Sequence, residues 1–241
     1  MVGSSAGGRA GSRRAEAYGM IFKTLTERRT LRMQQCQQRA YTAPRLWPMA
    51  QTLARTTLAL KEWGAVAHAL LQGRQAVLLR KGGIHEKRFE HAKGDRFVIM
   101  PTVAHSHAER VRDEHSDLLP LGAHDVRDDA FTVRCGVQLV DAIAVADPAA
   151  LPHLRDLHIW TDASVQTDRV EFRPKHPVYA LVVRAFALPE PVEIARIEAY
   201  GGCRSWVDLP VGWDGGGQAA ADNATLATVA DRVRRTVSAA A

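Results

Sequence analysis

Apolar residues at helical spacing mark three segments of the chain downstream of residue 55. Residues 56–73, TTLALKEWGAVAHALLQG, carry an apolar stripe that ends at Gly73, and residues 102–119 carry a second stripe. A third stripe, near the C-terminus, follows Asp222, whose carboxylate would accept hydrogen bonds from the N–H groups of a first helical turn. The pattern therefore predicts three amphipathic helices.

Shorter apolar runs predict strands between and after these helices, and the run 131–145 is also rich in β-branched residues. The runs are residues 75–80, 96–100, 131–145 and 178–188. Pro101 would end the second strand, and the last run is the most apolar of the chain, so we expect it at the centre of the sheet. Asp147-Pro148 predicts the start of one further short helix. Because strands and helices mix without a steady βαβ order, the sequence predicts an α+β fold with a mixed, mainly antiparallel sheet flanked by helices.

The charge of the chain is unevenly distributed. Residues 1–55 contain ten Lys and Arg and two acids, a net of +8, while the other 186 residues contain 22 Lys and Arg and 24 acids, a net of −2. We predict a disordered basic leader over residues 1–56, an α+β core domain over 57–214, and a Gly-rich linker with the last helix over 215–241. Because the core is nearly neutral, the overall basicity does not by itself indicate nucleic-acid binding.

Three interpretations of the basic leader stay open. The leader is one of three things: an arm that contacts nucleic acid, an Arg-rich organelle-targeting leader, or an upstream extension of no consequence. In the third case Met49 is an alternative start.

Cysteine usage and hydropathy indicate the compartment. Cys36, Cys135 and Cys203 stand alone without C-x-x-C spacing, which argues against a disulfide framework and a cysteine zinc site. Cys135 lies in a strand-like run and is expected to be a buried small hydrophobe. No apolar run approaches the roughly 20 residues that span a bilayer, and the N-terminus has no secretory pattern. We therefore predict a cytoplasmic protein that makes no membrane contact.

Four stretches of the chain together resemble one protein family. They are LKEWGAV, VLLRKGGI followed by RF, F-x-x-x-P-T-x-x-H from Phe97 to His105, and HIWT followed by RPKHPVYALVVR and GGCRSW. In this order and spacing, over roughly residues 58–210, they resemble the domain-of-unknown-function 1802 family. The resemblance implies a prokaryotic, intracellular protein and carries no activity, so the chemistry must come from the residues.

The first polar strip follows the strand predicted over 75–80. Arg80 and Lys81 precede Gly82-Gly83, whose exposed N–H groups beside two cations would suit an anionic oxygen. The spacing of a phosphate-binding Walker loop is absent. The strip is either an anion contact or an ordinary glycine turn with solvated charges.

The second polar strip follows Pro101. Thr102 would cap the next helix, on which His105 and Glu109 would lie one turn apart. These two side chains could hold a metal from one helix face, but two ligands do not make a site. His105 is a candidate catalytic residue because it lies just past a strand end, whereas His115, on the apolar stripe, is expected to be a hydrogen-bonded core histidine.

The third strip combines a histidine, a tryptophan and two arginines. Strand alternation in HIWT would place His158 and Trp160 on one face, where they could stack a base or sugar or close the edge of the core. Arg184 interrupts the apolar run 178–188, so it needs a carboxylate, with Glu62, Asp141 and Asp208 as candidates, or an anionic ligand. If Arg80, Arg184 and Arg204 lay together, they would form a pocket for a phosphate or carboxylate.

Three functions from different classes follow from these strips. The first is binding of an anionic, phosphate-bearing ligand, a nucleotide or nucleic acid, by Arg80, Lys81, Arg184 and Arg204, with His158 and Trp160 packed against it. The second is a hydrolase acting on phosphate or nucleic-acid substrates, with His105 as general base or metal ligand and Glu62 or Glu109 assisting. The third is a structural or protein-partner module without catalysis. The sequence assigns no cofactor or metal, and it lacks G-x-S-x-G, paired-carboxylate and dinucleotide patterns.

Overall fold

The computed structural model describes residues 56–81, 96–103, 107–202 and 204–238. The chain separates into two compact units, Met1–Ala50 and Gln51–Ala241. The first unit, with the predicted basic leader, lies outside the described residues. The fold below is that of the second unit.

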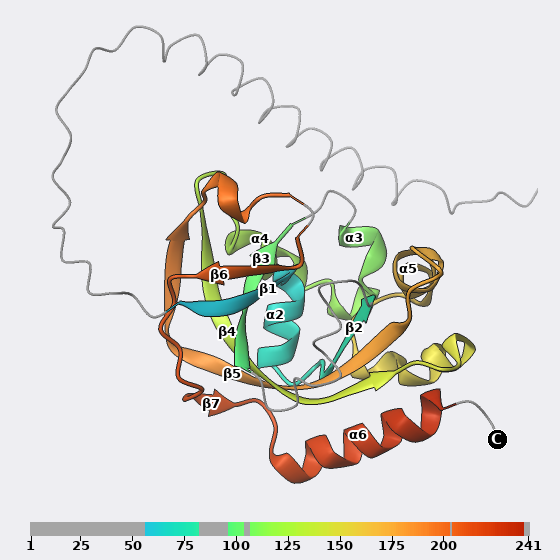
Figure 1. Ribbon diagram of the computed structural model, residues 1–241. Coiled ribbons are helices and arrows are strands. Elements are labelled where there is room, and N and C mark those ends of the chain that lie inside the picture. The colour runs from blue at the N-terminus through green and yellow to red at the C-terminus, as the bar shows by residue number, and fades with distance from the viewer. Residues whose placement is uncertain (1–55, 82–95, 104–106, 203, 239–241) are drawn as a thin grey trace, which may run out of the picture. The chain divides into compact units, whose positions relative to one another are not determined.

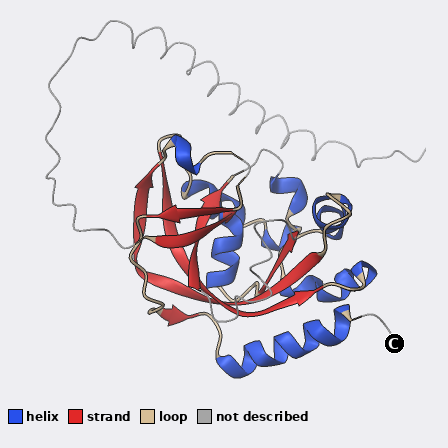
Figure 2. Ribbon diagram, in the orientation of Figure 1, coloured by secondary structure: helices blue, strands red, loops and turns tan. Residues whose placement is uncertain are grey.

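Seven strands form one sheet with the order β2-β5-β4-β3-β1-β6, and β7 pairs with β5. The strands are β1 (Thr57–Trp63), β2 (Val77–Lys81), β3 (Arg96–Thr102), β4 (Ala130–Ala144), β5 (Val178–Ala195), β6 (Trp206–Leu209) and β7 (Gln218–Ala219). Only the pair of β1 and β3 is parallel among the described strand pairs. The predicted mixed, mainly antiparallel sheet with flanking helices is confirmed (Figure 2).

Helical segments of several lengths connect and cover the strands. The α-helices are α2 (Gly64–Leu71), α3 (His107–Arg110), α4 (Leu118–His124), α5 (Asp162–Val165) and α6 (Asn223–Val237). Three 3₁₀ segments occupy Asp113–His115, Pro148–Leu157 and Glu198–Tyr200, and a π-helical segment occupies Gln166–Glu171. No described helix is long and apolar enough to cross a membrane.

The sheet curves around α2, which lies inside the curve and packs against α4 and four of the strands (Figure 1). Six of the eight residues of α2 are buried, so this helix is part of the core rather than a cover. Strands β1 and β3 are buried on both faces: Leu60 and Ile99 point into the main core, while Ala59 and Val98 point into a smaller second core. The C-terminal α6 packs against β4, β5 and the 3₁₀ segment Pro148–Leu157, and buries four apolar side chains in the main core.

Most of the predicted elements are present. The strands expected over 75–80, 131–145 and 178–188 appear as β2, β4 and β5. Asp222 caps α6, since its Oδ1 accepts from Thr225 N over 2.7 Å, and Asp147 caps the 3₁₀ segment by accepting from Ala149 N over 3.0 Å.

The helix predicted over 56–73 is wrong in its first half, which is β1. This stretch pairs in parallel with β3 and antiparallel with β6, and these ladders from distant parts of the chain outweigh the apolar spacing that suggested a helix. The helix begins only at Gly64. Strand β3 also continues through Pro101 to Thr102, which does not cap a helix: its Oγ1 donates to the carbonyl oxygen of Glu62 over 3.1 Å.

The single helix predicted over 102–119 is also wrong. The chain forms α3, the 3₁₀ segment Asp113–His115 and the start of α4, with Arg112 in an extended conformation between the first two. Val111 makes an isolated antiparallel bridge with Trp160, and Arg112 N donates to Ile159 O over 3.0 Å. The chain must be extended here to make these bonds, so a continuous helix is excluded. This bridge replaces the strand expected for HIWT.

Candidate functional site

The ends of β1 and β2 meet at one buried ion pair. Arg80 Nη1 donates to Glu62 Oε2 over 3.1 Å, and the other oxygen of Glu62 accepts from the backbone N–H of Trp63 over 2.9 Å. The side chain of Glu62 is only 3% exposed and that of Arg80 only 13%. Both carboxylate oxygens of Glu62 therefore accept hydrogen bonds, and the ion pair fixes the junction at which β1 ends and α2 begins.

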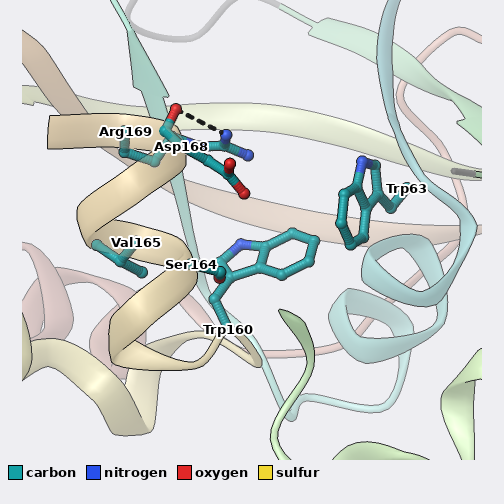
Figure 3. Close-up of a pocket in the computed structure, with 6 residues that line it drawn as sticks. All are labelled: Trp63, Trp160, Ser164, Val165, Asp168 and Arg169. Carbon is teal, nitrogen blue, oxygen red and sulfur yellow. Dashed lines mark hydrogen bonds between the residues drawn. The ribbon is translucent and has the colours of Figure 1, made fainter. Parts of the chain in front are cut away.

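Two tryptophans lie next to this pair. The rings of Trp63 and Trp160 make an edge-to-face contact with their centroids 4.6 Å apart. Figure 3 shows them beside a small cavity into which side chains extend from α5 and the π-helical segment. The cavity is lined by Trp63, Trp160, Ser164, Val165, Asp168 and Arg169. Its volume of about 10 Å³ suits a single water molecule, so a larger ligand would lie at its mouth.

Arg169 extends from the π-helical segment towards the cavity. Its Nε donates to Leu79 O over 2.8 Å and its Nη1 to Asp168 O over 3.3 Å, and its guanidinium carbon lies 6.0 Å from the centre of the Trp160 ring. Burial is the main influence on its pKa, which it lowers, aided by the nearby Arg80 and opposed by Glu62. Arg169 makes no ion pair with any described residue. π-Helical turns are frequent at functional sites.

Two further cations border the same region. Arg110 Nη1 donates to Asp168 Oδ2 over 2.8 Å, and its guanidinium carbon lies 5.9 Å from the centre of the Trp63 ring. Lys81 Nζ donates to Val170 O over 3.1 Å, and burial lowers the pKa of this amine. Arg80, Lys81, Arg110 and Arg169 thus gather here with two carboxylates, each of which already has an arginine partner.

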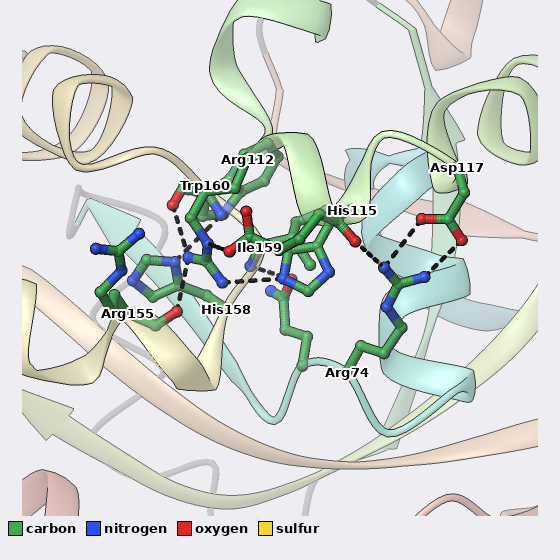
Figure 4. A network of polar contacts seen from close by, with 10 residues as sticks. Arg74, Arg112, His115, Asp117, Arg155, His158, Ile159 and Trp160 are labelled. Carbon is green, nitrogen blue, oxygen red and sulfur yellow. Dashed lines mark hydrogen bonds and ion pairs between the residues drawn. The ribbon is translucent and has the colours of Figure 1, made fainter.

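Arg112 holds the backbone that carries Trp160 in place. The guanidinium is 8% exposed; its Nη1 donates to Arg155 O over 2.7 Å and to Trp160 O over 3.0 Å, and its Nε donates to Glu114 over 2.6 Å. Its Nη2 lies 2.9 Å from His115 Nε2. Figure 4 shows the Arg112 side chain between two backbone segments, those of Arg155 and Trp160, whose carbonyl oxygens accept its hydrogen bonds. Arg112 therefore positions the aromatic wall of the cavity without reaching the cavity itself.

One protein-family model matches the part of the chain that contains this cluster. The model of the domain of unknown function DUF1802 matches residues 59–232. The chain belongs to the DUF1802 family. No curated protein and no solved structure matches it. The matched part of the DUF1802 domain runs from β1 into α6, so it contains every residue of the cluster described above.

The DUF1802 domain brings together four of the predicted site residues, Glu62, Arg80, Lys81 and Trp160. Glu109 is exposed on α3, and His105 and the glycines after Lys81 lie outside the described residues. The site therefore combines residues from the first and third polar strips.

His158 lies in the core, which favours the second of the two alternatives that the sequence leaves open for it, closing the core rather than contacting a ligand. It is 1% exposed, and its Nδ1 accepts from the backbone N–H of Trp160 over 3.2 Å. Its Nε2 is buried and has no hydrogen-bond partner among the described residues. Burial, with the neighbouring Arg112 contributing, lowers the pKa of His158 to about 4. His158 is thus a neutral core residue beneath Trp160, because HIWT turns inward instead of forming an edge strand.

The predicted pocket of Arg80, Arg184 and Arg204 does not form. Arg80 pairs with Tyr179 on β5, and Arg184 lies five residues further along that strand, roughly 17 Å away at 3.4 Å per residue. Arg204 is exposed, and follows glycines whose carbonyl oxygens accept from Lys61 Nζ. Alternation along β1 directs Lys61 to the face opposite Glu62.

None of the three predicted carboxylates pairs with Arg184. Glu62 pairs with Arg80 and Asp141 with Arg234, while Asp208 is exposed and makes no ion pair within the described part of the chain. The guanidinium of Arg184 lies 5.3 Å from the Phe186 ring and contributes to lowering the pKa of Asp222. The buried Nε of Arg184 has no hydrogen-bond partner among the described residues, so neither neighbour takes the place of an ion pair.

Four residues of the site escape sequence reasoning: Trp63, Arg110, Asp168 and Arg169. Trp63 fits an apolar helix stripe, and the other three lie in polar segments that resemble solvated surface. No three His, Cys, Asp or Glu side chains gather as metal ligands in the part of the chain that the structure describes. Burial raises the pKa of the Cys135 thiol to about 12, in keeping with the small buried hydrophobe that the sequence predicts.

Proposed function

We propose that the mouth of the Trp63–Trp160 cavity binds an anionic, phosphate-bearing ligand, a nucleotide or a nucleic acid. The observation that carries this proposal is the environment of Arg169. An arginine stays protonated at neutral pH even when its pKa is lowered, so its charge persists beside Arg80 and Arg110. An anionic ligand would supply the counter-charge that no described carboxylate provides as an ion pair.

The distribution of partners supports an anion rather than a cation. Among the described residues, Glu62 is committed to Arg80 and Asp168 to Arg110, which leaves the charges of Lys81 and Arg169 in excess. Arginine binds phosphate oxygens in a bidentate fork, and lysine adds a point charge. Of these cations, Arg169 lines the cavity and Arg110 pairs with Asp168, which also lines it, so both would donate to a phosphate at the mouth.

The ligand would lie outside the cavity rather than within it. The cavity suits one water molecule, but the Arg110 side chain at its border is 36% exposed and Trp63 is half-buried. A phosphate at this border would compete with Asp168 for Arg110.

The surroundings of Glu62 argue against its assisting a hydrolase, because its side chain is 3% exposed and both its oxygens accept hydrogen bonds. His105, the predicted general base, lies outside the described residues. We also infer a reducing, intracellular and prokaryotic setting from the free buried Cys135 and the family membership.

Thermal unfolding of the full chain with added ligands tests the proposal. Pyrophosphate, AMP, ATP and, as a sodium-matched control, chloride are added separately. A ligand present at 100 times its Kd adds about 2.7 kcal/mol to the free energy of unfolding, which raises Tm measurably. We expect this rise with the phosphate compounds, its loss in Arg169→Met, and its retention in Arg235→Met, an exposed arginine of α6. Each variant is compared with its own ligand-free Tm. No rise with any phosphate compound would contradict the proposal.

A further inference from the structure

A short exposed loop follows the π-helical segment, two residues of which line the cavity. Residues 172–176, Phe-Arg-Pro-Lys-His, follow the π-helical segment that carries Asp168 and Arg169. They lead into β5, whose first residue, Val178, pairs with Lys81. The 172–176 loop therefore begins after the segment that carries Arg169 and leads into a strand whose first residue pairs with Lys81. Both of its ends are held by elements of the cationic cluster.

The loop displays an aromatic ring instead of burying it. The side chain of Phe172 is 53% exposed, and the guanidinium carbon of Arg173 lies 5.2 Å from the centre of its ring. Lys175 is exposed and His176 is half-buried. Within residues 171–177 the sole acid is Glu171, which accepts from Gln166 over 3.1 Å. The surface here is therefore cationic with one open aromatic face.

The backbone of the loop is fixed without help from a ligand. His176 N donates to Arg173 O over 2.9 Å, which closes a turn, and proline occupies positions 174 and 177. Arg173 adopts φ of +48°, a left-handed conformation that side chains other than glycine rarely take. A ring and two cations held on a rigid turn lose little conformational freedom when they bind a partner.

We propose that the 172–176 loop is the base-stacking part of a site for single-stranded nucleic acid. A base stacks on Phe172, and the backbone phosphates lie along Arg173, Lys175 and the cationic cluster around Arg169. The inference rests on the proposed function, since the cluster at the cavity mouth supplies the phosphate contacts. Aromatic faces that stack bases beside cations that follow the backbone are the usual means of binding single strands.

A single strand fits this surface better than the other phosphate compounds. A mononucleotide offers one base and few phosphate oxygens. Either its base stacks on the loop or its phosphate binds at the cavity mouth. A strand carries a phosphate at every nucleotide and can engage both. A duplex keeps its bases stacked inside, where Phe172 cannot reach their faces.

Fluorescence anisotropy with labelled oligonucleotides tests the inference on the full chain. The probes are a 12-nucleotide oligo-U, the same length of oligo-dT, and a duplex of equal length, with pyrophosphate binding measured in parallel by calorimetry. The variants are Phe172→Ala, Phe172→Trp and Arg173→Gln, and the matched control is Ile197→Ala, an apolar side chain that is 50% exposed in the loop after β5.

We expect the strands to bind more tightly than the duplex. Phe172→Ala should weaken strand binding by roughly 10-fold, as removal of a stacking ring does, while Phe172→Trp and Ile197→Ala retain it. Arg173→Gln should reduce the slope of log K against log salt by about 0.7, the value for one lost phosphate contact on a single strand. Pyrophosphate binding should stay within about two-fold of the wild type in all of these variants, since they leave Arg169 intact.

Four results would overturn the inference. Equal strand affinity in Phe172→Ala and the wild type would remove the stacking role of the loop, and equal affinity for strand and duplex would remove the single-strand specificity. Pyrophosphate binding without any strand binding would sink this inference and leave the proposed function standing. Binding of neither probe would sink both.

Discussion

Arg80 of β2 is bonded to Glu62 of β1 across 3.1 Å, although the two strands are not neighbours in the sheet. β5, β4 and β3 lie between them in the strand order. The contact therefore requires the sheet to curve until its two sides approach, and α2 fills the space enclosed. The ion pair connects the two sides of the curved sheet, beside the cavity that Trp63 and Arg169 line. The fold and the candidate site therefore depend on the same contact.

Breaking this pair from the acidic side should destabilise the protein strongly. Glu62→Gln leaves Arg80 buried without its counter-charge, and we expect the free energy of unfolding to fall by about 3 kcal/mol. Arg80→Met combined with Glu62→Gln should recover part of this loss, since no uncompensated charge remains. Urea unfolding of the two single variants and the double variant measures the coupling. Asp208→Asn, an exposed position on β6, serves as the control, and equal stability of Glu62→Gln and Asp208→Asn would refute the role assigned to the pair.

Arg112 offers a second test, of support for the site rather than of the site itself. Arg112→Met removes the donors to Arg155 O and to the carbonyl oxygen of the buried Trp160, so we expect a loss of about 3 kcal/mol in unfolding free energy. Near-ultraviolet circular dichroism should change too, because Trp160 loses its fixed position. Arg127→Met is the matched control: its ion pair with Glu193 is exposed, and we expect no measurable change in either signal. An Arg112→Met protein as stable as this control would contradict the assignment.

The sequence predicts those parts of the fold whose pattern is local. Short apolar runs predict β2, β4 and β5 correctly, and the side-chain caps Asp147 and Asp222 mark true starts of helical segments. β1 was misassigned because its apolar residues satisfy helical spacing. Its strand conformation comes from ladders with β3 and β6, the second of which lies about 150 residues further along, and such pairing leaves no local trace.

The candidate site divides in the same way. Arg80 and Lys81 could be found because charges that follow a buried strand are conspicuous. Arg169 could not, since its importance comes from neighbours contributed by β2, α3 and the segment around Trp160. Sequence reasoning correctly marked Arg184 as a residue that needs an explanation, but it could not tell that the position lies far along β5 from Arg80.

The crossing of α2 and α4 allows no side chain at its closest point. A Cβ on Gly64 would lie 2.5 Å from the carbonyl oxygen of Gly122, and the clash can be relieved only by shifting α4 or the buried α2. Gly64→Ala should therefore lower the free energy of unfolding by about 2 kcal/mol or more, and displace the adjoining Trp63. Gly216→Ala is the control, because its new Cβ would meet only the movable carboxylate of Asp214. Thermal unfolding compares the two, and an unchanged Tm in Gly64→Ala would show that the helices are not packed this closely.

The buried His158 makes stability depend on pH in a defined window. Its pKa is lowered from 6.5 to about 4, so the unfolded chain takes up a proton between these values while the folded protein does not. As pH falls from 6.5 to 4 the unfolded state is favoured, and the loss reaches about 3 kcal/mol for the full difference in pKa. Asp125 does not compete in this window. Although burial raises its pKa, hydrogen bonds from His68 and Arg134 lower it below 3.8, so its stabilising contribution persists until the pH falls below that value.

His158→Asn, which keeps an acceptor for Trp160 N, should flatten the profile of unfolding free energy measured in urea from pH 7 to 4. His153→Asn, at an exposed position, should leave it unchanged, and identical profiles for the two variants would show that another group is responsible.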